Sequence, residues 1–140
     1  MPLTLDDRQQ VEDLLVRYSY AVDTDGGEDA FAEMFTEDAV LIGTRGHRTG
    51  MKAVRELART VTDRKGFQAR HIITNVLIEG DSGEARIRAY FTEYYTYNEL
   101  LPPKLMRTSE LIYVGTFDCT AVKVSGSWKF SRRVVHCDAP

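Results

Sequence analysis

The second half of this chain reads almost entirely as β-strand, whereas helical patterns are confined to the first half. Four long runs rich in β-branched and aromatic residues span Arg70 to Glu79, Glu84 to Tyr97, Met106 to Val124 and Trp128 to Cys137. Because short connections between consecutive strands favour hairpins, we expect these runs to pair antiparallel. Strands that follow helices, rather than alternate with them, predict an α+β fold.

The first helix is expected from Thr4 to about Asp23. Apolar residues recur at helical spacing along this segment, and Thr4 and Asp7 are spaced as an N-terminal capping pair. The pattern therefore predicts an amphipathic helix with one buried side.

A short second helix, a hairpin and a third helix are expected next. Glu28 to Phe35 has acidic residues in its first turn and apolar residues on one side. Ala39–Ile42 predicts a strand, and a turn-rich hairpin loop follows at 43–47. Helical spacing resumes at residue 49 or 50 and continues to Val61.

Both faces of the strand that contains His71 are largely apolar. Simple alternation places His71, Ile73, Asn75 and Leu77 on one face. A sheet buried on both faces is expected where helices cover one side and a partner subunit the other. We therefore expect a strongly curved, mostly antiparallel sheet wrapped around the helices, with a pocket inside the curve. Gly115 predicts a bulge at which the third strand run bends.

Composition narrows the class of protein. The 140 residues, 43% of them apolar, suffice for one domain over residues 1–140 with a core and a pocket. The net charge of -3, from 18 basic and 21 acidic residues, leaves no basic surface for nucleic acid or an anionic membrane. No segment resembles a membrane span or a signal peptide, so we expect a cytoplasmic protein.

The two cysteines and three histidines show no metal-ligand spacing. Cys119 and Cys137 are expected to be structural thiols, because free cysteine is often buried. His47 and His136 are expected at the surface. His71, in contrast, lies on an apolar strand face, which lowers the pKa of a histidine and keeps it neutral as a base.

Asp23 and His71 are the candidates for acid/base chemistry. Asp23 ends the first helix, where the helix dipole disfavours a carboxylate unless a cation or donor compensates. A carboxylate beside an imidazole fixes its tautomer and stabilises the imidazolium. The alternative to a catalytic role is that Asp23 belongs to a solvated turn and that His71 is a core residue whose hydrogen bonds are made within the protein.

Further candidates are aromatic or basic. The phenol of Tyr18 can donate a hydrogen bond to a substrate oxygen, or its ring can simply pack in the core. Alternation puts Tyr90 and Tyr94 on one strand face, where they either line a pocket or only pack. Arg132 and Arg133 lie on opposite faces of the last strand, so one points inward or to an interface, or is solvated.

An ordered set of residues resembles a known family. The set is Tyr18, Asp23, Phe35-Thr36-Glu37-Asp38-Ala39, Arg70-His71 with Asn75, Gly115-Thr116-Phe117-Asp118, and Trp128 followed by Arg133 and Asp138. It is similar, over nearly the whole chain, to the SnoaL-like family of the nuclear-transport-factor-like superfamily, of the scytalone dehydratase, bile-acid dehydratase and hexachlorocyclohexane dehydrochlorinase type.

The resemblance implies an α+β cone with a deep pocket, and a homo-oligomer, either a trimer or a dimer. By position it makes His71 the base and Asp23 its partner, and it matches Tyr18 and Arg133 to residues at the pocket of relatives. Phe35, Leu41, Tyr90 and Tyr94 are then expected to shape the substrate site. The chain lacks the second histidine that scytalone dehydratase uses, which argues against that substrate.

The implied reaction is elimination of water or a similar leaving group beside an acidified C–H bond of a small hydrophobic substrate, cyclic or resembling a polyketide or steroid. Neither a metal nor an organic cofactor is implied. Two alternatives remain open. An isomerase or cyclase would return the proton to another carbon, and a non-catalytic relative would bind a ligand or act as an accessory subunit, because a fold does not fix a function.

Overall fold

The computed structural model of the chain describes residues 1–24, 27–63, 66–98 and 109–138. The elements in chain order are α1 (Leu5–Asp23), α2 (Glu28–Ala32), β1 (Phe35–Gly43), β2 (Gly46–Thr49), α3 (Met51–Thr62), β3 (Phe67–Gly80), β4 (Glu84–Tyr97), β5 (Ser109–Val124) and β6 (Ser127–Cys137). The expected α+β architecture is confirmed.

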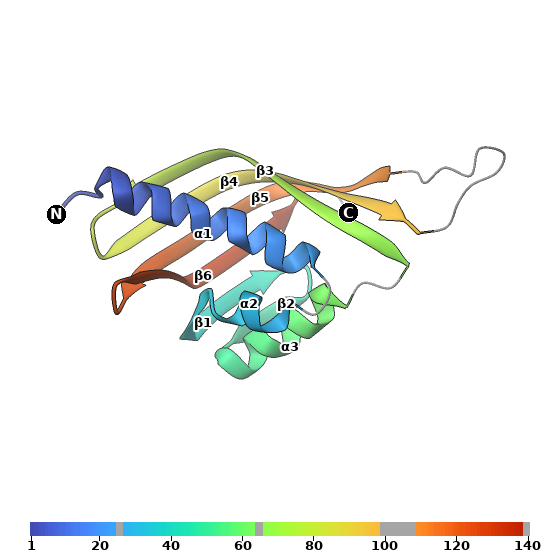
Figure 1. Cartoon of the computed structure of the whole chain (residues 1–140), viewed down its shortest axis with the longest axis horizontal. Coiled ribbons are helices and arrows are strands. Elements are labelled where there is room, and N and C mark those ends of the chain that lie inside the picture. The colour runs from blue at the N-terminus through green and yellow to red at the C-terminus, as the bar shows by residue number, and fades with distance from the viewer. Residues whose placement is uncertain (25–26, 64–65, 99–108, 139–140) are drawn as a thin grey trace.

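The strands of the described residues form one six-stranded sheet in the order β2-β1-β6-β5-β4-β3. All neighbouring strands pair antiparallel except β1 and β6, which are parallel. The sheet curves, and α1 lies across it while α2 and α3 lie beside β1 and β2 (Figure 1). The core between these layers is rich in aromatic rings, among them Phe31, Phe35, Phe117 and Phe130, each fully buried.

Helix α1 is held to the sheet at its N-terminus by Asp7. Asp7 and Thr4 form the predicted capping box, with the Asp7 backbone N–H donating to Oγ1 of Thr4 at 3.0 Å. The same carboxylate accepts from Nζ of Lys123 at 3.0 Å and from Nε1 of Trp128 at 3.2 Å. Mainly because of Lys123, the pKa of Asp7 falls to about 2.

The boundaries of the first strand differ from those expected. Helix α2 ends at Ala32 instead of reaching Phe35, and β1 starts at Phe35, earlier than the expected Ala39. Phe35 pairs in register with Phe130 of β6, and their ring centroids are 5.5 Å apart. Pairing with a distant strand, which no local pattern reports, therefore overrides helical spacing here.

Strands β3 to β6 follow the predicted runs closely. Strand β4 has the predicted ends, and β3 and β6 begin earlier than expected, at Phe67 and Ser127. Of the third predicted run, residues 106–108 lie outside the described residues, as does most of the loop expected at 98–104.

A bulge in β3 overturns the simple alternation expected for this strand. The register of β3 against β4 shifts between Thr74 and Leu77, and Asn75 adopts a positive φ of 54°. Beyond the bulge, Val76 packs against the core while Asn75 and Leu77 face outward. One extra residue reverses the face of every side chain that follows it.

The bulge in β5 does not lie at Gly115. Glu93 of β4 pairs with Tyr113 and the next residue of β4 pairs with Leu111, so the extra residue of β5 is Ile112. Gly115 is instead a point of close approach. A Cβ there would collide with the carbonyl oxygen of His136 and with the ring of Phe91.

None of the helices in the described residues is long and apolar enough to cross a membrane.

Candidate active site

Asp23 and His71 form a buried pair. Asp23 ends α1 and His71 lies near the start of β3, and the two side chains are 9% and 10% exposed. The carboxylate engages the histidine twice: Oδ2 accepts from the backbone N–H of His71 at 2.8 Å, and Oδ1 lies 2.6 Å from Nδ1. This second contact assigns a proton to Nδ1 and directs Nε2 away from Asp23.

A third titratable group, Glu93, completes the site. Glu93 lies directly opposite His71 in the β3–β4 register, and its Oε2 is 3.3 Å from Nε2 of His71. Its side chain is 11% exposed. The imidazole therefore lies between two carboxylates, one at each ring nitrogen.

This arrangement contradicts the expectation of a lowered histidine pKa. Burial does lower the pKa of His71, but hydrogen bonds to Asp23 and Glu93, together with their charges, raise it to about 9. At neutral pH the imidazole is consequently an imidazolium, with a proton on both nitrogens.

Tyr18 and Arg133 form a second polar pair. Arg133 points into the sheet's concave side and is 8% exposed, whereas Arg132 is exposed on the other face. Nη1 of Arg133 donates to the hydroxyl of Tyr18 at 2.7 Å. Since burial raises the pKa of Tyr18, its hydroxyl keeps a proton that it can donate.

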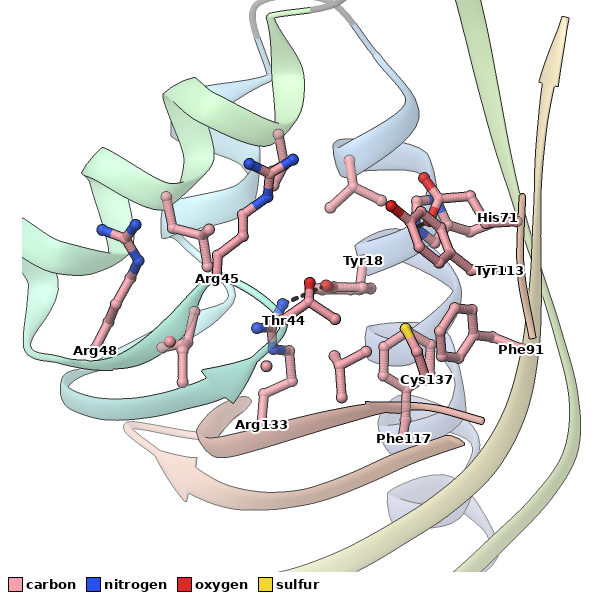
Figure 2. A pocket seen from close by; sticks show the side chains of 18 of the residues that line it. Tyr18, Thr44, Arg45, Arg48, His71, Phe91, Tyr113, Phe117, Arg133 and Cys137 are labelled. Atoms are coloured by element: carbon pink, nitrogen blue, oxygen red, sulfur yellow. Dashed lines mark hydrogen bonds and ion pairs between the residues drawn. The ribbon is translucent and has the colours of Figure 1, made fainter. Parts of the chain in front are cut away.

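The four side chains His71, Glu93, Tyr18 and Arg133 line one cavity. It contains about 790 Å³ of space free of atoms, the opening to solvent included. Its walls combine polar and apolar side chains, and the apolar part includes Val22, Leu41, Leu57, Phe91 and Phe117. Figure 2 shows His71, Phe91 and Tyr113 on one side of the cavity, and Arg45, Arg48 and Arg133 on the other.

Of the four residues expected to shape the substrate site, only Leu41 lines this cavity. Phe35 is buried in the core behind it, packed against Phe31. Tyr90 is 58% exposed on the outer face of the sheet, and Tyr94 shares that face. The expected pocket role of Phe35, Tyr90 and Tyr94 is thus corrected; the cavity side of β4 presents Phe91, Glu93 and Tyr95.

The bulge in β3 explains why Glu93 escapes sequence reasoning. Near the turn, Gly80 pairs with Ala85 and Leu77 with Arg88, a register that would place Tyr94 opposite His71. The extra residue at Asn75 moves the pairing by one position and brings Glu93 there instead. The local hint in the sequence is that residue 75 is an asparagine, a residue type that adopts positive φ more readily than most.

The cysteines and the remaining histidines lie where the sequence analysis expects them. Cys119 is a free, buried thiol, and burial raises its pKa to about 12. Cys137 is also free and half-buried, and it touches the cavity. His47 and His136 are exposed. Within the described residues, no group of three or more His, Cys, Asp or Glu side chains could hold a metal ion.

Fold and site together define an α+β cone whose sheet and helices enclose a pocket with an Asp–His–Glu cluster. The model of the SnoaL-like domain matches residues 3–134. The chain therefore belongs to the SnoaL-like family.

Solved structures share this fold. A protein provisionally assigned as a scytalone dehydratase, from Novosphingobium aromaticivorans, is 25% identical, with a TM-score of 0.78 over 96% of this chain and 86% of that one. A protein of unknown function with a cystatin-like fold, from Nostoc punctiforme, is 23% identical, with a TM-score of 0.76 over 99% and 96%. LinA is 22% identical, with a TM-score of 0.76 over 96% and 88%. No curated protein matches the chain in sequence.

Proposed function

We infer that this protein is a cofactor-independent lyase that eliminates water, or a similar leaving group, from a small hydrophobic substrate. The observation that carries the proposal is the imidazole of His71 held between Asp23 and Glu93 at the wall of a cavity that apolar side chains help to line. An elimination needs a base for the C–H bond and an acid for the leaving group. One imidazole and one carboxylate that share a proton can supply both.

The proposed cycle starts from the imidazolium–carboxylate pair. As substrate enters, the shared proton moves from Nε2 of His71 to Glu93, so that Nε2 becomes free. Nε2 then takes the proton from the substrate C–H bond while Glu93 donates its proton to the leaving hydroxyl, which departs as water. A C=C bond forms, and the imidazolium–carboxylate pair is restored. Asp23 accepts the hydrogen bond from Nδ1 and stabilises the imidazolium through it.

Tyr18 and Arg133 support the developing charge. An acidified C–H bond lies beside a carbonyl group, whose oxygen becomes negative as the proton leaves. The Tyr18 hydroxyl, already bound to Nη1 of Arg133 at 2.7 Å, has a proton to donate to that oxygen. Donors fixed in a buried site stabilise such charge more than water does, because they need no reorientation.

The test is turnover of a substrate panel of hydroxylated ketones, steroids and polycyclic phenols, followed as loss of water by mass spectrometry. We expect His71→Ala and Asp23→Asn each to lower kcat by at least about a hundredfold. His136→Gln, which changes an exposed histidine outside the cavity, is the matched control and should keep full activity. Unchanged turnover in both site variants would remove the basis of the proposal.

An isomerase or cyclase is the second candidate, and the position of Glu93 favours it. A protonated group beside the abstracted proton can return a proton to a different carbon of the same intermediate. Such a reaction leaves the mass of the substrate unchanged, so the same assay separates the two. The third candidate, a protein that only binds its ligand, corresponds to binding without any product from the panel.

Assembly and location stay predictions. We propose a homo-oligomer, trimer or dimer. Large apolar side chains on the sheet's outer face support this, because Ile72, Tyr90 and Val114 are exposed there. We likewise propose the cytoplasmic location expected from the sequence.

A further inference from the structure

We propose that the substrate carries a carboxylate, held at the end of the cavity opposite His71 by Arg133, Arg48 and Arg45. The inference rests on the proposed function in that it assigns the substrate class of the same cavity. It depends mainly on Arg45 and Arg48 of the β1–β2 hairpin, which the elimination chemistry does not use. Arg133 takes part in both, with Nη1 bound to Tyr18 and its other nitrogens left for the ligand.

Strand register places two of these arginines side by side across the sheet. Leu41 of β1 pairs with Arg48 of β2 on one side and with Arg133 of β6 on the other. Leu41 is fully buried on the concave face, and directly paired residues share a face. Arg48 and Arg133 therefore both point to the concave side, from backbones roughly 10 Å apart, or two strand spacings.

Both arginines have a buried donor without a partner. Nε of Arg48 and Nε of Arg133 are buried and form no hydrogen bond with the described residues. Within those residues, Arg45, Arg48 and Arg133 also form no ion pair with a carboxylate. Buried donors without partners cost free energy, and a ligand with acceptor oxygens can pair with the guanidinium groups that line the cavity.

The charge of this end of the cavity selects an anion. Among the described residues that line the cavity, three carry guanidinium groups and one, Glu93, carries a carboxylate, which is engaged by His71. The chain as a whole has a net charge of -3. The absence of a side chain at Gly43 keeps the arginine approachable, because a Cβ there would lie 3.4 Å from Nη2 of Arg133. The planar fork of a guanidinium matches the two oxygens of a carboxylate.

The separation of the His71 end and the arginine end of the cavity sets the shape of the ligand that fits it. His71 is on β3 and Arg133 on β6, with β4 and β5 between them. Apolar side chains between the two ends include Phe91 and Phe117, 4.7 Å apart by ring centroids. The ligand is therefore an apolar acid, with its reacting C–H bond and its carboxylate at opposite ends of a ring-containing body.

The test compares binding of naphthoate and of its uncharged isostere, naphthamide, by isothermal titration calorimetry at low ionic strength. Because hydrogen bonds between charged groups are the strong ones, we expect naphthoate to bind at least about tenfold more tightly. Added NaCl should weaken naphthoate binding and leave naphthamide binding unchanged. The Arg45→Gln/Arg48→Gln double variant should lose most of the preference, and Arg132→Gln, on the opposite face, should keep it.

Arg133→Gln should abolish the preference for naphthoate over naphthamide. This variant also removes a buried contact to Tyr18 and could fail to fold. In that case the double variant in the β1–β2 hairpin, which lies further from the core, still decides the test. Equal binding of acid and amide, no binding of the acid at millimolar concentration, or an unaltered preference in the double variant would overturn the inference. Since no turnover is measured, such a result leaves the proposed elimination standing. Conversely, His71→Ala should retain the preference for the acid even where it abolishes turnover.

Discussion

At the scale of single residues, His71 is defined by what lies at each of its nitrogens. Asp23 is 2.6 Å from Nδ1 and Glu93 is 3.3 Å from Nε2, so two carboxylates compete with burial for control of its charge. The carboxylates prevail, and the pKa of His71 rises to about 9. A histidine with this pKa is protonated at neutral pH and can donate a proton, whereas a neutral imidazole could only accept one.

Glu93→Gln is expected to impair catalysis and to change its pH dependence. The glutamine cannot accept the shared proton, so kcat should fall by roughly a hundredfold or more. In the unaltered protein, the proposed cycle needs one proton on the His71–Glu93 pair, and kcat/KM should therefore fall as the pH rises through about 9. Glu93 is one of the groups that raise the pKa of His71, so this pKa should be lower in the variant. The residual activity of the variant should therefore decline at a lower pH.

A pH–rate profile measured for both proteins checks this prediction. A rate that instead climbs steadily up to about pH 9 would mean that His71 acts as a simple base without the shared proton. Glu84→Gln, at an exposed position far from the cavity in the β3–β4 turn region, is the matched control.

At the scale of elements, the bulge in β3 decides which side chains meet. Elements that local patterns specify could be predicted from the sequence: the capping box starts α1, and strand-like composition between two turns gives β4 its ends. The register between β3 and β4 could not, because it depends on Asn75 entering the left-handed region within a paired strand. The Asp23–His71 pair follows from the family resemblance and needs no register, whereas sequence reasoning misses Glu93 and expects a pocket role for Tyr90 and Tyr94 that the structure gives to Phe91, Glu93 and Tyr95.

Substitutions at Asn75 test this role of the bulge. At a φ of 54°, Asn75→Gly should change the free energy of unfolding by less than about 1 kcal/mol, because glycine tolerates this conformation. Asn75→Val should lower it by about 1–3 kcal/mol, because a β-branched residue is strained there. Urea unfolding measures both, with Thr74→Val, at the exposed neighbour, as control. Equal stability of the Val and Gly variants would argue that the bulge is not strained.

At the scale of the whole molecule, α1 is fastened to the sheet by an acidic residue near each end. Asp7, in its first turn, contacts Lys123 and Trp128 of the β5–β6 hairpin, and Asp23, its last residue, contacts His71 of β3. The helix thus spans the concave face of the sheet (Figure 1). Its side chains Tyr18 and Val22 line the cavity. The contact at each end of α1 depends on the protonation state of one group, Asp7 at the first turn and His71 opposite the last residue, and the fold shifts the pKa of both groups.

The stability of the fold should therefore decline on both sides of a pH range. The pKa of Asp7 is lowered from 3.8 to about 2, so its contribution is complete above about pH 4 and is lost as the pH falls toward 2. The pKa of His71 is raised from 6.5 to about 9, so its contribution is complete below about pH 6.5 and is lost as the pH rises through 9. The alkaline loss should amount to at most about 3 kcal/mol.

Free energies of unfolding measured by urea between pH 2 and pH 10 would show this profile. Asp7→Asn should flatten only the acid side, and Asp23→Asn only the alkaline side. If Asp23→Asn left the alkaline decline as steep as before, other groups would be responsible for it.

The proton on His71 is the point on which the whole account depends. We would follow the ring ¹⁵N resonances of His71 by NMR from pH 6 to pH 11, in the unaltered protein and in Asp23→Asn. We expect an imidazolium up to a pKa of about 9, followed by a neutral ring protonated at Nδ1, and a lower pKa in the variant. A pKa near 6.5 in both proteins, or a neutral ring protonated at Nε2, would contradict it.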